Sequence, residues 1–88
     1  MKTSVAAQLA ASAVLEREAD LSFTMAVERL VDRELARWTW DSEQDDVAGL
    51  ICARTHRALV TVDVVARTFE ADEEALTELA EWDLESGV

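Results

Sequence analysis

Proline is absent from this sequence, and glycine occurs only twice, at Gly49 and Gly87. Both residue types are common in the tight turns that join strands, so their scarcity favours helices over a turn-rich β fold. No stretch of the sequence approaches the ~18 consecutive apolar residues that a membrane-spanning helix requires. Apolar residues nevertheless make up 50% of the chain, which is enough for a hydrophobic core and speaks against wholesale disorder.

Cysteine is almost as scarce, because Cys52 is the only one in the chain. No intrachain disulfide can form, and a reducing cytoplasm fits this composition. Cys52 and His56 lie four residues apart and could supply half of a zinc site, but no second pair completes it, so we expect no metal and no cofactor. The sequence also has no phosphate-binding glycine loop and no hydrolase motif, and nothing pairs His56 with a nucleophile. We therefore expect a protein that is not an enzyme.

Basic residues are few, with 8 against 19 acidic residues and a net charge of −11. Such a charge repels nucleic acids and anionic membranes and favours a basic protein partner. An acidic surface is also typical of salt-adapted proteins, so a halophilic source is a second explanation. Residues 1–44 carry a net charge of −3 and residues 45–88 a net charge of −8. The N-terminal half is therefore the part of the chain better suited to a polyanion.

The clearest periodicity in the sequence runs from Leu21 to Trp38, where apolar side chains recur at three- and four-residue steps. This spacing predicts an amphipathic helix, with Ser22 as its N-cap. We expect residues 6–38 to form a homodimer, with an interface on the apolar stripe of this helix: Phe23, Val27, Leu30, Val31, Leu35 and Trp38. Three arginines at four-residue spacing form a basic ridge that is the possible contact for DNA or another polyanion: Arg29, Arg33 and Arg37.

Further helices are predicted on both sides of this stretch. Residues 2–5 are a possible short strand, and residues 6–19 are rich in alanine, the best helix former. A capping box of Ser42 and Asp45 predicts another helix, which ends near residue 59. Residues 58–65 alternate valines as a strand would, but Thr61 can also cap a helix, and we interpret residues 62–69 as helical. Asp72 caps a last helix over residues 73–85.

These predictions define an all-α, or nearly all-α, fold of four to five short helices. Residues 1–40 form an N-terminal helical half that dimerises. Residues 41–88 form an acidic half that resembles a helix-turn-helix, and both halves belong to one compact unit.

Two resemblances to known families support the idea of a regulatory protein. Residues 61–79 resemble a helix-turn-helix, with the buried positions of that motif at Val65, Ala66, Phe69, Ala71, Leu76 and Leu79. The second helix of that motif carries glutamates here, whereas DNA-reading helices carry Arg, Lys, Asn or Gln. Residues 21–38 resemble the second helix of the ribbon-helix-helix regulators, which include many antitoxins. The matching residues are Leu21-Ser22, Ala26-Val27, Leu30-Val31 and Leu35.

The last predicted helix carries a row of four glutamates, Glu74, Glu78, Glu81 and Glu85, whose spacing places them on one face. This acidic ridge either pairs with the arginine ridge or binds a basic partner, and we favour the second interpretation. The leading hypothesis is a small cytoplasmic, antitoxin-like regulatory protein that covers a basic protein partner. The alternatives are a salt-adapted helix-turn-helix transcription regulator that binds DNA, and a structural or viral assembly subunit.

Overall fold

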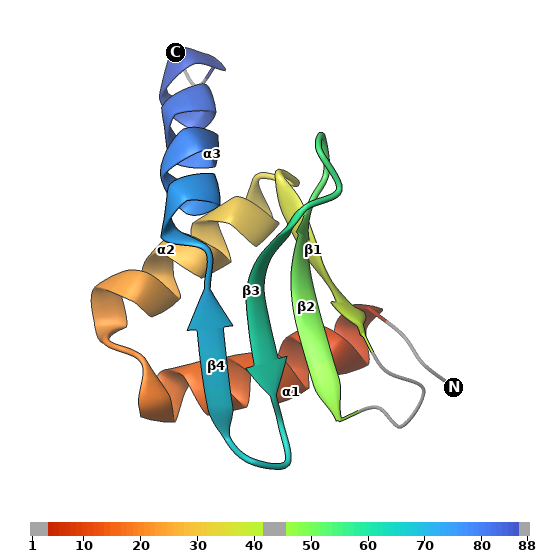
Figure 1. Ribbon diagram of the computed structural model, residues 1–88. Coiled ribbons are helices and arrows are strands. Elements are labelled where there is room, and N and C mark those ends of the chain that lie inside the picture. Colours follow the sequence, from red (N-terminus) through yellow and green to blue (C-terminus); the bar gives the residue numbers. More distant parts are fainter. Residues whose placement is uncertain (1–3, 42–45, 87–88) are drawn as a thin grey trace.

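The computed structural model describes residues 4–41 and 46–86 and forms an α+β domain. Each strand pairs antiparallel with the next, so the sheet has the order β1-β2-β3-β4. Figure 1 shows α1 and α2 behind this sheet and α3 rising from one end of it. Along the chain, the elements are α1 (Ser4–Glu18), α2 (Leu21–Asp32), β1 (Ala36–Trp40), β2 (Val47–Cys52), β3 (Ala58–Asp63), β4 (Thr68–Ala71) and α3 (Glu73–Ser86).

The predicted all-α fold is therefore wrong, because the middle of the chain forms a four-stranded sheet. The predicted helix over residues 21–38 ends at Asp32, and Trp38 lies in β1. The segment predicted as a helix up to residue 59 contains β2 and the start of β3. The predicted helix over residues 62–69 is instead the end of β3, a turn and the start of β4. Short apolar runs have no period that separates a buried strand from a helix, which explains these errors.

The helix-turn-helix interpretation of residues 61–79 is also wrong, because the segment that would form its first helix contains strands β3 and β4. Val60 and Val62 alternate with Thr61 and Asp63 along β3, and the two valines are buried whereas Thr61 and Asp63 are only partly so. This alternation is the strand signal that the sequence contains. At the N-terminus, α1 already begins at Ser4, and the rest of the possible strand lies outside the described residues. The predicted capping box of Ser42 and Asp45 also lies outside them.

One face of the sheet and all three helices share a single core. Buried residues recur at every second position of β1, β2 and β3, although Gly49 and Leu59 are buried as well. The register places Trp38 opposite Leu50 and Leu50 opposite Val60. Small residues on α1 allow this helix to lie close to the sheet, since Ala7 and Ala11 are both 0% exposed. The remaining core members come from every element except β4, whose Phe69 and Ala71 are only partly buried: Val14, Leu15, Val27, Leu30, Ala36, Ala48, Cys52, Leu59, Val62, Ala75 and Leu79.

The end of α2 shows why the sequence conceals the following strand. The N–H of Leu35 donates to the carbonyl of Leu30 at 2.9 Å, and the N–H of Glu34 donates to that of Val31 at 3.0 Å. These two bonds define a Schellman motif, in which the residue after the C-cap adopts the left-handed conformation. Glycine usually fills that position, but here it is Glu34, with φ of 60°. The helix therefore stops at a residue that carries no sequence signal for stopping.

Both described hairpins also contain a residue other than glycine in the left-handed conformation. The turn between β2 and β3 contains His56, with φ of 61°, and the turn between β3 and β4 ends at Arg67, with φ of 59°. In the second turn, the carboxylate of Asp63 accepts hydrogen bonds from the N–H groups of Val65 and Ala66 at 3.0 and 2.9 Å. The scarcity of glycine therefore does not exclude tight turns in this chain.

Helix starts follow the expected chemistry more closely. Asp72 caps α3 as predicted, because its carboxylate accepts the N–H of Ala75 at 3.0 Å. The N-cap of α2 is Asp20 instead of Ser22, and it accepts the N–H of Phe23 at 2.8 Å. This bond, with a second one from the Ser22 hydroxyl, lowers the pKa of the Asp20 carboxyl below its ordinary value.

Replacing Glu34, His56 or Arg67 singly with glycine should stabilise the protein. An L-residue in the left-handed conformation costs about 1–2 kcal/mol. Glycine avoids that cost but loses about 0.5–1 kcal/mol through its freedom in the unfolded chain. We expect a net rise in the free energy of unfolding of roughly 0.5–1 kcal/mol, measured by urea denaturation.

Glu28→Gly is the control for these glycine variants, since Glu28 is an exposed residue in the helical part of α2. This substitution should lower the free energy of unfolding by about 1 kcal/mol. A loss of stability at all three left-handed positions would contradict the role assigned to them.

Candidate functional site

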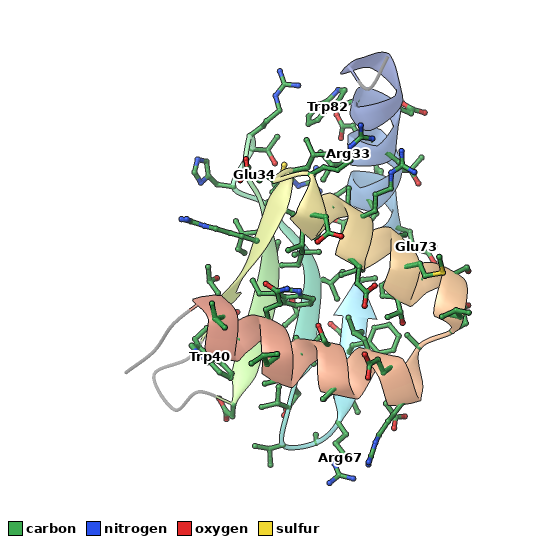
Figure 2. The ribbon with its side chains drawn as sticks, turned by 180° about the vertical axis from the view of Figure 1, so that it is seen from behind. Arg33, Glu34, Trp40, Arg67, Glu73 and Trp82 are labelled. Carbon is green, nitrogen blue, oxygen red and sulfur yellow. The ribbon has the colours of Figure 1, made fainter. Side chains whose placement is uncertain are left out.

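The acidic ridge predicted from the sequence lies on α3, a helix that is attached to the domain along one side only. Ala75 and Leu79 are buried against the core, and Leu76 and Trp82 pack at its margin. The guanidinium of Arg54 lies 4.9 Å from the centre of the Trp82 ring, which holds α3 beside the β2–β3 turn. Figure 2 labels Glu73 and Trp82, which mark the first turn and the distal part of this helix.

The charged side chains on the exposed side of α3 are all acidic among the described residues. Glu73, Glu74, Glu78 and Glu81 line a hollow of about 490 Å³ together with Thr77. Within the part of the chain that the structure describes, Glu74, Glu78 and Glu81 have no ion-pair partner. Glu85 belongs to α3, but its side chain lies outside the described part. Like charges four residues apart destabilise a helix slightly, so these carboxylates favour a cationic partner.

An apolar groove runs between α2 and α3 and adjoins this acidic surface. It encloses about 430 Å³, and Thr77 lines both the groove and the acidic hollow. The ring of Phe23 in the groove wall packs on Phe69 of β4 with a centroid distance of 5.4 Å, so the wall is anchored in the domain. The groove is lined by Phe23, Ala26, Val27, Arg29, Leu30, Leu76, Thr77 and Ala80.

Burial in the groove is incomplete, which leaves apolar surface open to a ligand. Ala26 and Ala80 are exposed, and Phe23 and Leu76 are only partly buried. Two large apolar side chains of α2, Leu21 and Met25, are also solvent-exposed, by 73% and 58%. An apolar groove with carboxylates along its α3 side can bind one face of an amphipathic helix.

The three arginines of the predicted basic ridge do not lie on one helix face. Arg29 lines the rim of the groove, Arg33 is the C-cap of α2, and Arg37 lies on β1. Arg29 and Arg33 each take part in an interaction within the molecule. The ridge is lost because α2 ends at Asp32 and a strand with a two-residue period follows.

The predicted dimer stripe is largely occupied by packing within one chain. Val27, Leu30 and Trp38 are buried in the core, and Trp38 is only 2% exposed. The other members, Phe23, Val31 and Leu35, are partly buried against that core. The periodicity of residues 23–38 therefore has an explanation within the subunit, and the dimer itself stays a prediction.

Cys52 and His56 do not share a helix face. Cys52 ends β2 and is 2% exposed, whereas His56 lies in the following turn and is exposed. Burial raises the pKa of the Cys52 thiol, but hydrogen bonds with Thr55 and the charge of Arg54 outweigh it, so this pKa lies below its ordinary value. Among the described residues, no cluster of three or more His, Cys, Asp or Glu side chains is arranged to hold a metal ion.

Another hollow, of about 700 Å³, lies at the end of the sheet where α2 meets β1. Glu34, Arg37 and His56 line it, together with apolar side chains such as Val31 and Ile51. No hydrogen bond joins these three polar side chains to one another in the described part of the chain. The α3 surface is the stronger candidate because its charges share one sign and adjoin an apolar groove.

No protein-family model, no curated protein and no solved structure matches this chain. In the segments that the structure describes, no helix combines the length and apolar character needed to cross a membrane.

Sequence reasoning located the acidic face of α3 but missed the groove beside it. The groove joins Phe23 and Ala26 to Leu76 and Ala80, which lie about fifty residues further along the chain. The exposed Leu21 and Met25 are the only local signal, since they lie off the buried stripe of α2.

Proposed function

We propose that this protein is a small non-enzymatic, antitoxin-like binding protein that covers a basic amphipathic segment of a protein partner. The observation that carries this proposal is a row of unpaired carboxylates, Glu74, Glu78 and Glu81, beside the apolar groove between α2 and α3. Apolar side chains of the partner would fill the groove, and its Lys or Arg side chains would meet the carboxylates.

The two parts of the surface would contribute differently to binding. Apolar anchors in a groove supply most of the affinity of such interfaces. Charges at the rim mainly steer the encounter and select the partner, and their effect weakens as salt rises. The acidic rim favours a cationic partner, whereas nucleic acid is repelled by the net charge of −11.

We further infer that the protein acts in the cytoplasm as a homodimer. The single cysteine, Cys52, is a free and buried thiol, so the fold does not depend on a disulfide and is compatible with a reducing cytoplasm. An assembly subunit remains the second candidate, because one face of the sheet carries no helix in the described structure.

The Glu74→Gln, Glu78→Gln, Glu81→Gln triple variant tests the binding proposal. The probe is a synthetic amphipathic helical peptide with leucine on one face and lysine on the other, and binding is measured by calorimetry. Close charge pairs across an interface couple by about 1.5–7 kcal/mol, so we expect binding to weaken roughly tenfold or more. Thermal stability should stay unchanged or rise, because like charges on α3 are removed.

The matched control is Glu16→Gln, Glu18→Gln, Glu28→Gln, which removes the same charge from exposed positions on α1 and α2. This control should bind the peptide nearly as tightly as wild type. If both triple variants weakened peptide binding equally, the effect would come from net charge alone, and a defined site would be refuted. Unchanged affinity with a clear loss of stability would show that the carboxylates have an internal structural role.

A further inference from the structure

The hollow of about 700 Å³ at the end of the sheet is a second candidate site. Three segments of the chain meet there: the end of α2, the strands β1 and β2, and the turn between β2 and β3. Figure 2 labels Glu34, which marks this place just after α2. The hollow shares no lining residue with the groove between α2 and α3 or with the acidic hollow of α3. Binding at this site is therefore independent of the proposed function.

The hollow combines an apolar wall with polar side chains of both charges. Val31 and Ile51 are partly buried and belong to the apolar wall. The register pairs Arg37 directly with Ile51, so these two side chains stand next to each other on one face of the sheet. Glu34, Arg37 and His56 also line the hollow and are exposed to solvent. Such a lining suits a small molecule that is charged at one end and apolar at the other.

The charged side chains of the hollow have no partner within the described protein. Glu34 and Arg37 carry opposite charges, yet no ion pair joins them to each other or to another described side chain. The imidazole of His56 likewise makes no hydrogen bond in the described part of the chain. A carboxylate and a guanidinium are therefore both available to a ligand. A ligand that satisfies both must itself carry a positive and a negative group.

The backbone around the hollow is fixed by hydrogen bonds. Leu35, directly after Glu34, accepts the N–H of Ala53 at 2.9 Å, which joins the chain just before β1 to the chain just after β2. The N–H of His56 donates to the carbonyl of Cys52 at 2.9 Å, which closes the turn after β2. The polar groups are thus held in place before a ligand arrives, which lowers the entropic cost of binding.

Backbone strain is also found at this hollow. Among the described residues other than glycine, three adopt the left-handed conformation, and two of them, Glu34 and His56, line the hollow. Such strain is concentrated at ligand-binding sites, where the side chain has a role that offsets it. Glycine at either position would relieve the strain but would also remove the polar side chain.

We propose that this hollow binds a free α-amino acid with an aliphatic side chain. Such a ligand carries both charges at one end and its apolar side chain at the other, as the lining requires. Arg37 would hold the carboxylate through two parallel hydrogen bonds, and His56 can donate a further N–H to it. Glu34 would accept hydrogen bonds from the ammonium group, and the aliphatic side chain would lie on Val31 and Ile51. A simple anion fits less well, because Glu34 would repel it.

Titration of the isotope-labelled full chain with L-leucine, followed by the amide signals in NMR spectra, tests the site. The signals of Ala53 and His56 should shift, because both residues line the hollow, whereas those of Thr77 and Glu78 on α3 should not. Two analogues test the need for both charges: isocaproate lacks the ammonium group of leucine, and isoamylamine lacks its carboxylate. Each should bind roughly tenfold or more weakly than leucine, since each loses one hydrogen-bonded charge.

Variants separate binding from folding. Glu34→Gly removes the carboxylate and relieves the strained backbone, so it should weaken leucine binding roughly tenfold while raising the free energy of unfolding. Arg67→Gly is the matched control, because it relieves the same conformation outside the hollow and should leave leucine binding unchanged. Glu34→Gln keeps the shape of the side chain and should abolish the preference for leucine over isocaproate.

The proposal is overturned if millimolar leucine shifts none of the signals from the hollow, or if either analogue binds as tightly as leucine. Equal weakening of leucine binding by Arg67→Gly and Glu34→Gly would also overturn it. The loss would then follow from the backbone change and not from the missing carboxylate.

Discussion

Trp38→Ala is expected to lower the free energy of unfolding by about 3–5 kcal/mol, measured by urea denaturation followed by circular dichroism. Trp38 is 2% exposed and is among the largest fully buried side chains of the protein. It faces Leu50 across β1 and β2, so its removal leaves a cavity between the sheet and the helices. A loss of this size is a large part of the ~4–13 kcal/mol expected for a domain of 88 residues.

Trp82→Ala is the matched control, because Trp82 is only partly buried on α3. It should cost clearly less than Trp38→Ala. The measurement also separates two roles for Trp38. If Trp38→Ala dissociated a dimer without changing the stability of the monomer, Trp38 would belong to an interface between subunits and not to the core.

Ala11→Leu should destabilise the protein by about 1–3 kcal/mol, again measured by urea denaturation. Ala11 is 0% exposed where α1 lies against the sheet, so a larger side chain must push the helix away or take a strained rotamer. Ala13→Leu on the same helix is the control, since Ala13 is exposed and both substitutions have similar helix propensity. Equal stability of the two variants would show that α1 has room to move away from the sheet.

The helices illustrate what could be predicted from local sequence. α1 spans Ser4–Glu18 where residues 6–19 are predicted, and α3 spans Glu73–Ser86 where residues 73–85 are predicted. Alanine-rich composition and an aspartate cap act within one turn of the chain, so neighbouring residues contain the information. The exposure of the glutamates on α3 follows from the same local periodicity.

The strands could not be predicted in the same way, although part of the signal was present. The alternation of Val60 and Val62 in β3 indicated a strand, but the left-handed turn residues Glu34, His56 and Arg67 gave none of the glycine signals that mark strand boundaries. Apolar spacing alone could not separate the buried strand β2 from a helix.

The sequence by itself determined the acidic character of the chain, the apolar content for one core, and the helices at its two ends. The tertiary structure decided that the middle of the chain is a sheet and that the apolar stripe of α2 packs in the core of its own subunit. It also decided that Phe23 and Leu76 border one groove. The physical reason lies in the hydrogen bonds. A helix satisfies its backbone groups within four residues, whereas each strand here depends on partners in another strand that only the folded chain brings together. At the end of the β1–β2 ladder, for example, the N–H of Asp41 donates to the carbonyl of Val47 at 2.7 Å.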